Sequence, residues 1–433
     1  MPYYLRLRKA NLMRGTNKKT SLFYGFIGFF LSSVVQLFAI GKYIDNSIIN
    51  EYSPLAVDAD SYVKLATNWS SQGFTETFFD LHRTPGYPAV IYFFDFLFPS
   101  NSYFALRIFQ FLAVSVAIGT LTIILSKYTK SNLLILYSFF LSLLPIWHFT
   151  PLILAESLTF FVTTIILFVL QLFCISKNSL IAVVSLGILL GIMIYLKPNN
   201  IIILPLVIIL IIIVKLKASF KFVGLLLIVL FAVLLPWFTH AEKSQGNFFT
   251  LSTSSGINLY IGTGMESNRS SNLVLANSAS KWRVTEEFNQ LDIVEPNLNL
   301  TAQQSNDLYM KTAVDIWKKR PWQQIGFSFD KVLIAFGIKS NTLSDYLFGI
   351  YNLITIICSI YFILINIHRT IGFCTLIMAF LLSAQAVAFQ ADRRFIVSIF
   401  LPFASITIGL FALKTTTAFR NYMRRYHKLN EKT

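Results

Sequence analysis

The stretch SLFYGFIGFFLSSVVQLFAIGKYI, residues 21–44, decides the fold, because Lys42 is its only charged residue. An apolar run of about 17–25 residues can cross the hydrocarbon core of a bilayer as a helix. We therefore expect an all-α polytopic membrane protein with about ten transmembrane helices. Further runs of this kind lie near 101–126, 131–148, 152–175, 179–196, 199–214, 222–240, 343–366, 371–390 and 395–413.

The composition excludes an ordinary soluble domain. Of the 433 residues, 55% are hydrophobic and 13% are charged, and the mean hydropathy is +0.63. A soluble domain carries roughly a quarter charged residues, whereas an ionised side chain at the bilayer centre costs several kcal/mol. The three cysteines all lie in apolar runs, so no disulfide framework is expected.

The basic residues set the expected orientation. If the N-terminal end is cytoplasmic, every loop predicted on that side is basic, and of the 20 acidic residues only Glu431 lies there. This is the distribution that the positive-inside rule describes. We therefore predict that both termini are cytoplasmic, and that the net charge of +16 reflects topology and anionic lipid contact rather than nucleic-acid binding. The compact chain suggests a prokaryotic plasma membrane, with the active site on its outer face.

Two long outer segments divide the chain. Residues 1–240 form an N-terminal transmembrane module whose first outer loop spans 45–100, and residues 343–433 form C-terminal helices with a basic tail. The segment 241–342 between them is expected to be a small mixed α/β cap. It begins with a strand-like stretch, Phe248 to Gly264, and continues with a helical pattern from Ser305 to Arg320 and an amphipathic stretch from Trp322 to Gly337. Loops of this length usually carry function.

The first outer loop holds two neighbouring carboxylates before a short helix. Apolar residues from Tyr62 to Trp69 recur at helical spacing. Acidic residues are common caps at helix N-termini, and capping is the simpler explanation for Asp60. Asp58 is expected just before the helix, where it is freer to project into a cavity.

The same loop then reads His82-Arg83-Thr84-Pro85-Gly86-Tyr87-Pro88, followed by a short apolar helix to Pro99. Taken alone, this is a rigid turn into a membrane helix. Together with the upstream acid, four residues before Tyr62, it resembles the first outer loop of the GT-C superfamily of membrane glycosyltransferases, which includes the protein O-mannosyltransferases and the lipid A aminoarabinose transferase. Other similar stretches follow in the family's order: Ala155-Glu156, Lys197-Pro198, Pro236-Trp237, Ser254 to Leu259, and Tyr309 to Phe336. The sequence departs from the family at Phe238-Thr239-His240, where an Arg-Asn pair is common.

The resemblance implies an enzyme that moves a sugar from a polyprenyl-phosphate donor to a protein, lipid or glycan acceptor at the outer face. Such a donor needs an apolar groove, cations at headgroup depth and a carboxylate that faces the acceptor. We expect Asp58 to be the general base, with Asp60 as the second candidate for the catalytic carboxylate. The remaining candidates are the phosphate-binding residues Arg83, Lys197, Arg393 and Arg394 and the supporting polar residues Tyr62, Glu156 and His240.

The role of Glu156 and the need for a metal stay open at this point. Glu156 is expected one turn inside its helix, where a carboxylate is costly unless it meets a partner or a polar cavity. Pairing with a cation and a direct catalytic role are equally compatible with that place. A cluster of Asp58, Asp60 and Glu156 could hold Mg²⁺ or Mn²⁺, and no His or Cys spacing indicates zinc.

Other classes of protein compete with this hypothesis. A transporter or flippase for polyprenyl-linked glycans would need a similar groove, but transporters usually show repeat symmetry and charges near mid-membrane. A glycan polymerase would not be expected to share the Arg-Thr-Pro-Gly-Tyr-Pro loop. A non-catalytic scaffold would not need acids and arginines at the lipid boundary.

Overall fold

The computed structural model describes residues 18–44, 57–72, 83–128, 133–143, 146, 149–175, 179–215, 218–252, 255–263, 302–338, 343–365, 368–388 and 396–430. Within these ranges all regular secondary structure is helical. The elements of the first half are α2 (Lys18–Ile44), α3 (Val57–Gln72), α4 (Gly86–Leu97), α5 (Ser102–Ser126), α6 (Leu133–Ser142), α7 (Glu156–Ile175), α8 (Ser179–Leu196), the 3₁₀ helix η2 (Pro198–Ile202) and α9 (Ile203–Val214). Those of the second half are α10 (Ser219–Gln245), α11 (Ser255–Gly262), α14 (Ala302–Lys319), α15 (Pro321–Ala335), α16 (Leu343–Leu364), α17 (Arg369–Ala388), the π-helix η4 (Ile396–Phe400) and α19 (Leu401–Asn430).

Eight helices in the described part of the chain are long and apolar enough to cross a membrane. This confirms the all-α polytopic class, and the other two expected spans coincide with shorter apolar helices. These are α6, with ten residues, and α9, with 12 residues. Pro198 begins the 3₁₀ turn η2, which continues directly into α9, whereas the ten residues of α6 span roughly 15 Å at 1.5 Å per residue. The hydrocarbon core is about 30 Å thick.

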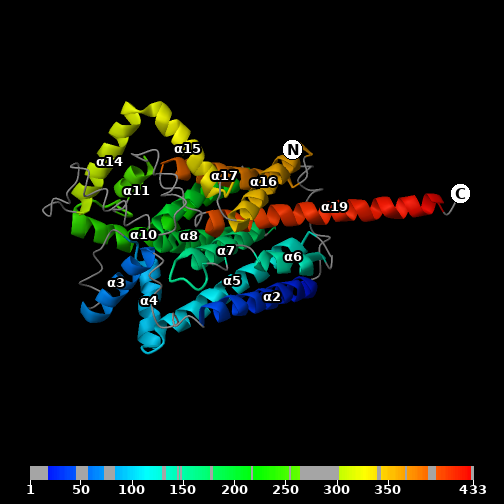
Figure 1. Cartoon of the computed structure of the whole chain (residues 1–433), viewed down its shortest axis with the longest axis horizontal. Coiled ribbons are helices and arrows are strands. Elements are labelled where there is room, and N and C mark those ends of the chain that lie inside the picture. The colour runs from blue at the N-terminus through cyan, green and yellow to red at the C-terminus, as the bar shows by residue number, and fades with distance from the viewer. Residues whose placement is uncertain are drawn as a thin grey trace.

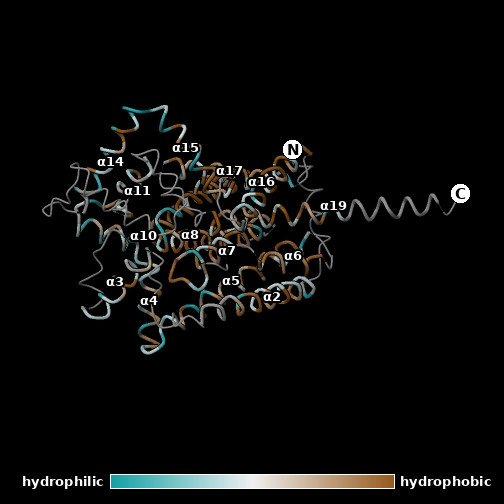
Figure 2. The backbone as a smooth tube through the Cα atoms, in the orientation of Figure 1, coloured by the Kyte–Doolittle hydropathy of each residue, from teal (hydrophilic) through white to brown (hydrophobic). Residues whose placement is uncertain are grey.

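The long helices run side by side along the longest axis of the molecule (Figure 1). Helices α3, α4, α11 and α14 gather at one end of this bundle, which we call the loop side, and the C-terminal end of α19 lies at the other end. Hydrophobic segments dominate the bundle, whereas hydrophilic segments appear in α3 and α14 (Figure 2). Helices α3 and α4 of the first outer loop and helices α11 and α14 of the cap segment therefore lie at the same end of the molecule.

Small residues let the helices approach closely. On α8, Gly187 and Gly191 lie against Val229 and Val233 of α10, and a methyl group on either glycine would overlap those valines. This four-residue spacing of small residues is typical of helix pairs in membranes, where close packing replaces the hydrophobic driving force.

The expected strand in the cap is wrong over Ser255–Gly262, which forms α11. The side chain of Asn306 in α14 accepts hydrogen bonds from the backbone N–H of Gly256, at 2.6 Å, and from the Ser255 hydroxyl, at 3.1 Å. These bonds satisfy donors at the start of α11, as a local cap would. A residue fifty positions away thus caps the helix, and Gly264 lies outside the described residues.

The Pro236-Trp237 pair is expected at the end of the seventh helix, but it lies inside that helix. Helix α10 continues through Pro236 to Gln245, and it ends where Gly246 takes the left-handed conformation with φ of 68°. Such a glycine is a common helix terminator. The helix therefore ends at Gln245, five residues beyond the expected span of 222–240.

Candidate functional site

The first outer loop begins with α3, which packs against α4. The buried residues of α3 form one stripe, from Tyr62 through Leu65 to Trp69. Because α3 starts at Val57, Asp58 lies in its first turn and not before the helix as expected. The side chains of Asp58 and Asp60 lie outside the described residues, so only their places in the helix are considered.

Arg83 connects the turn before α4 to the face of α3. Its Nε donates a hydrogen bond to Ser61 Oγ at 2.9 Å, and its guanidinium carbon lies 5.3 Å from the centre of the Tyr62 ring. The Tyr62 ring in turn meets Tyr87 edge-to-face at 5.0 Å. A planar guanidinium suits both contacts, since it donates in its plane and stacks on aromatic faces.

Tyr87 joins this cluster to the bundle through a buried polar network. Its hydroxyl donates to Gln110 Oε1 at 2.6 Å, and Gln110 Nε2 donates to the carbonyl oxygens of Thr150 and Leu152, each at 2.8 Å. Burial, with a further contribution from the Glu156 carboxylate, raises the pKa of Tyr87 well above its usual value. The phenol therefore stays protonated and keeps its donor role. Arg107, one turn before Gln110, donates from Nε to the Pro151 carbonyl at 2.8 Å.

The same turn lies against the end of α8. Gly86 has no side chain, and a β-carbon there would come within 2.5–2.6 Å of the carbonyl group of Tyr195. Tyr195 and Leu196 immediately precede Lys197. The close approach at Gly86 therefore brings the Arg-Thr-Pro-Gly-Tyr-Pro turn beside the Lys197-Pro198 corner, although the two motifs are more than a hundred residues apart.

Lys197 and Glu156 form a buried ion pair. The distance between Lys197 Nζ and Glu156 Oε1 is 2.5 Å, and the two side chains are 9% and 1% exposed. Glu156 is the first residue of α7, rather than one turn inside it as expected. Of the two roles that the sequence leaves open for Glu156, the geometry shows the pairing with a cation. Because its ammonium meets this carboxylate, the predicted contact of Lys197 with a donor phosphate stays a prediction.

The remaining predicted residues are His240, Arg393 and Arg394. His240, near the end of α10, lies against Trp237 of its own helix, with ring centres 5.6 Å apart. Arg393 and Arg394 lie outside the described residues. The structure therefore brings together Tyr62, Arg83, Glu156 and Lys197 around Tyr87, and the functional roles of all the candidate residues stay predictions.

The predicted carboxylate cluster for a metal also stays untested. Across the described ranges, no group of three or more His, Cys, Asp or Glu residues could hold a metal ion. The cluster would need Asp58 and Asp60, whose side chains are not placed, together with Glu156, which is directed at Lys197.

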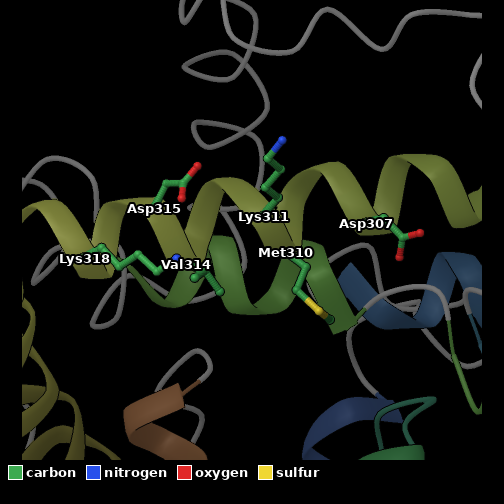
Figure 3. Close-up of a pocket in the computed structure, with 6 residues that line it drawn as sticks. All are labelled: Asp307, Met310, Lys311, Val314, Asp315 and Lys318. Atoms are coloured by element: carbon green, nitrogen blue, oxygen red, sulfur yellow. The ribbon is translucent and has the colours of Figure 1, made fainter.

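A surface pocket of about 380 Å³ runs along α14 (Figure 3). None of the predicted site residues lines this pocket. The lining residues recur at helical spacing along one stripe: Asp307, Met310, Lys311, Val314, Asp315 and Lys318. Acidic and basic side chains alternate along this stripe, so it does not select a charged ligand of one sign.

The sequence reasoning missed the role of Gln110. This residue lies in an otherwise apolar span, is fully buried, and holds three partners. Polar side chains within membrane spans are costly and are often functional. The occurrence of Arg107 and Gln110 three residues apart in an apolar span could therefore have indicated a buried polar site. Its partners, which come from two other segments, could not be predicted from the sequence.

The fold of this chain is similar to that of two solved structures. Two structures of the oligosaccharyltransferase from the archaeon Archaeoglobus fulgidus are similar to this chain. The complex of AglB with an inhibitory peptide and a dolichol-phosphate gives a TM-score of 0.53, covers 92% of this chain and has 13% sequence identity. The apo form gives a TM-score of 0.54 over 94% of this chain, also at 13% identity.

The chain spans about half the length of these relatives, 52% in each case. No family model and no curated protein matches the sequence. The chain thus shares the fold of these two structures, at a sequence identity that establishes the fold alone.

Proposed function

We propose that this protein is a membrane glycosyltransferase of the GT-C type, which takes a sugar from a lipid-phosphate donor. The observation that carries the proposal is the shared fold over 92% of the chain, with Arg83, Tyr62 and the Glu156–Lys197 pair gathered on the loop side. The similar archaeal structure is a complex with a dolichol-phosphate and a peptide. This supports a lipid-linked donor and leaves the sugar and the acceptor open.

Arg83, Arg393 and Arg394 are the proposed ligands of the donor phosphate. A guanidinium carries five N–H donors and binds phosphate in a bidentate manner. The contact of Arg83 Nε with Ser61 fixes the guanidinium plane over Tyr62. Lys197, held by Glu156, is better suited to positioning the corner beside Gly86.

Asp58 is the proposed general base, and the helical register of α3 favours it over Asp60. Asp58 lies four, seven and eleven positions before Tyr62, Leu65 and Trp69, which are buried. Asp60 lies four and seven positions before Lys64 and Thr67, which are exposed. Positions four and seven apart share a helix face, whereas positions two apart do not. The backbone position of Asp58 is therefore on the face that meets Arg83 and Tyr87.

In the proposed reaction, an acceptor hydroxyl or amine attacks the anomeric carbon of the sugar. Asp58 takes the acceptor proton, the bond between the anomeric carbon and the phosphate oxygen breaks, and the lipid phosphate leaves with the electron pair. The arginines balance the charge of that leaving group. Since phosphate leaves readily, no second acid is needed, in contrast to the carboxylate pair of a glycosidase.

The test compares Asp58→Asn with Asp60→Asn in a sugar-transfer assay. Asparagine keeps the shape of the side chain and removes the base, so Asp58→Asn should lower turnover by about 10²–10⁴-fold, with folding and donor binding retained. Asp60→Asn should cost much less. Transfer by Asp58→Asn at the wild-type rate would place the base elsewhere. Equal loss in both variants, restored by added Mn²⁺, would instead indicate a shared metal.

A further inference from the structure

Helix α15 has its polar face turned toward the protein. Gln324 Nε2 donates to the Thr263 carbonyl at 2.6 Å, and Lys331 Nζ donates to the carbonyls of Gly262 and Val387, both at 2.6 Å. Gln324 and Lys331 are seven positions apart and therefore share one face, and they are 2% and 1% exposed. These bonds attach α15 to the end of α11 and to the end of α17, and they fix which way the helix faces.

The opposite face of α15 is apolar and exposed. Trp322, Ile325 and Phe329 recur at helical spacing and are 83%, 52% and 66% exposed. A helix on the surface of a soluble protein has the reverse arrangement, with its apolar stripe on the core. With 15 residues, α15 is roughly 22 Å long, which is too short to cross the hydrocarbon core of about 30 Å.

The contacts of its C-terminal end place α15 at the depth of the membrane spans. Asn352 Nδ2 donates to the Phe336 carbonyl at 2.8 Å, and Gly349 lies directly against the Gly337 carbonyl. Both partners belong to the candidate span Tyr346–Leu364. Val387, which accepts from Lys331, is the last residue of another span, Thr370–Val387. The C-terminal end of α15 therefore lies level with membrane-spanning residues, next to the apolar outer surfaces of α16 and α17.

The N-terminal end of α15 carries the opposite chemistry. Lys318, Lys319 and Arg320 are exposed, and Pro321 then starts α15 after a sharp bend from α14. We call residues 318–321 the elbow. The elbow stands out to one side of the bundle (Figure 1), rather than along the bundle axis. Three cations beside an exposed tryptophan match the composition of a membrane-water interface.

We propose that α15 inserts obliquely into the lipid leaflet on the loop side, with its apolar face on acyl chains, the elbow on the phosphates of phospholipid headgroups and its C-terminal end deeper. Trp322 then lies near headgroup depth, and Phe329, seven residues or roughly 10 Å further along the helix, lies deeper. Through the bonds to Gly262 and Thr263, this helix also ties α11 to the bilayer. This contact of α15 with lipid does not depend on the proposed sugar transfer.

The test uses the full chain in bilayer nanodiscs whose phosphatidylcholine carries bromine at shallow (6,7) or deep (11,12) acyl positions, because bromine quenches tryptophan at contact. The signal of Trp322 is the fluorescence difference between the wild type and Trp322→Phe. We expect shallow bromines to quench this difference at least twofold more than deep ones. Phe329→Trp, made in the Trp322→Phe background, should shift the quenching toward the deep bromines.

Lys311→Trp in the same background serves as the control, because Lys311 is exposed on α14 before the elbow, and neither lipid should quench it. Trp322 fluorescence that neither brominated lipid changes would overturn the proposal, since the residue would then lie in water. Quenching of Lys311→Trp as strong as that of Phe329→Trp would overturn it as well, because lipid contact would not be specific to α15.

Discussion

Lys197→Met, which removes the Lys197 ammonium, should destabilise the protein more than the same substitution at an exposed lysine. Methionine has a similar length and leaves the buried Glu156 carboxylate without its ammonium partner. The pair is short, at 2.5 Å, and its side chains are 9% and 1% exposed. Breaking such a pair by removing one partner costs about 3–5 kcal/mol.

This free energy converts into a measurable change in melting temperature. An unfolding entropy of roughly 2.1 cal/mol/K per residue over 433 residues gives about 0.9 kcal/mol/K. Lys197→Met should therefore lower the apparent Tm in detergent by about 3–5 °C, as measured by thermal unfolding followed with size-exclusion chromatography. Lys243→Met is the matched control, because Lys243 is exposed on α10 and its loss should leave Tm unchanged.

The double variant Glu156→Gln/Lys197→Met separates the ion pair from simple loss of packing. Replacing both partners of a buried pair is often neutral, so the double variant should regain much of the Tm lost by Lys197→Met. An apparent Tm of Lys197→Met equal to that of Lys243→Met would refute the reasoning. A double variant with the summed loss of the two single variants would refute it too.

Two further predictions test the orientation and the packing at the candidate site. Reporter fusions at Lys177 and Asn289 should report opposite sides of the membrane, and the same side for both would discard the predicted topology. Gly86→Ala should lower the apparent Tm and the yield of folded protein, because the new methyl group meets the backbone of Tyr195 and overpacking of this kind costs about 1–3 kcal/mol. Gly224→Ala, where the methyl group meets nothing within 4 Å, is the control, and equal behaviour of the two variants would contradict the close approach of α4 and α8.

The sequence predicts local structure well wherever local signals decide it. The apolar runs identify the eight spans, and the turn at Pro85-Gly86 correctly precedes a short helix, α4. The expected helix from Ser305 to Arg320 is confirmed as α14, and the amphipathic stretch from Trp322 is confirmed as α15.

The failures come from contacts between distant segments. The expected strand from Phe248 to Gly264 missed α11, whose cap comes from Asn306, fifty residues further along the chain. Pro236 is tolerated inside α10, although proline usually ends or kinks a helix.

The candidate site shows the same division. Arg83, Tyr62, Glu156 and Lys197 could each be chosen from the sequence, because charged or polar residues at the lipid boundary are few. Their mutual geometry could not, since it depends on the close approach at Gly86 and on the three partners of Gln110. The sequence shows which side chains of a helix are polar. The segments that supply their hydrogen-bond partners depend on the packing of the whole bundle.

The proposed function requires this protein to bind a lipid-phosphate sugar donor and to transfer its sugar. The most direct measurement is mass spectrometry of lipids that co-purify with the wild type and with the Arg83→Ala/Arg393→Ala/Arg394→Ala variant, followed by incubation of the wild-type extract with candidate acceptors. The proposal predicts an isoprenoid-phosphate sugar enriched on the wild type, reduced at least tenfold on the variant, and consumed when sugar appears on an acceptor. Absence of any isoprenoid phosphate above the level on an unrelated membrane protein from the same membranes would contradict the proposal. If the protein instead moves the sugar lipid from one leaflet of a vesicle membrane to the other without loss of its sugar, it is a flippase.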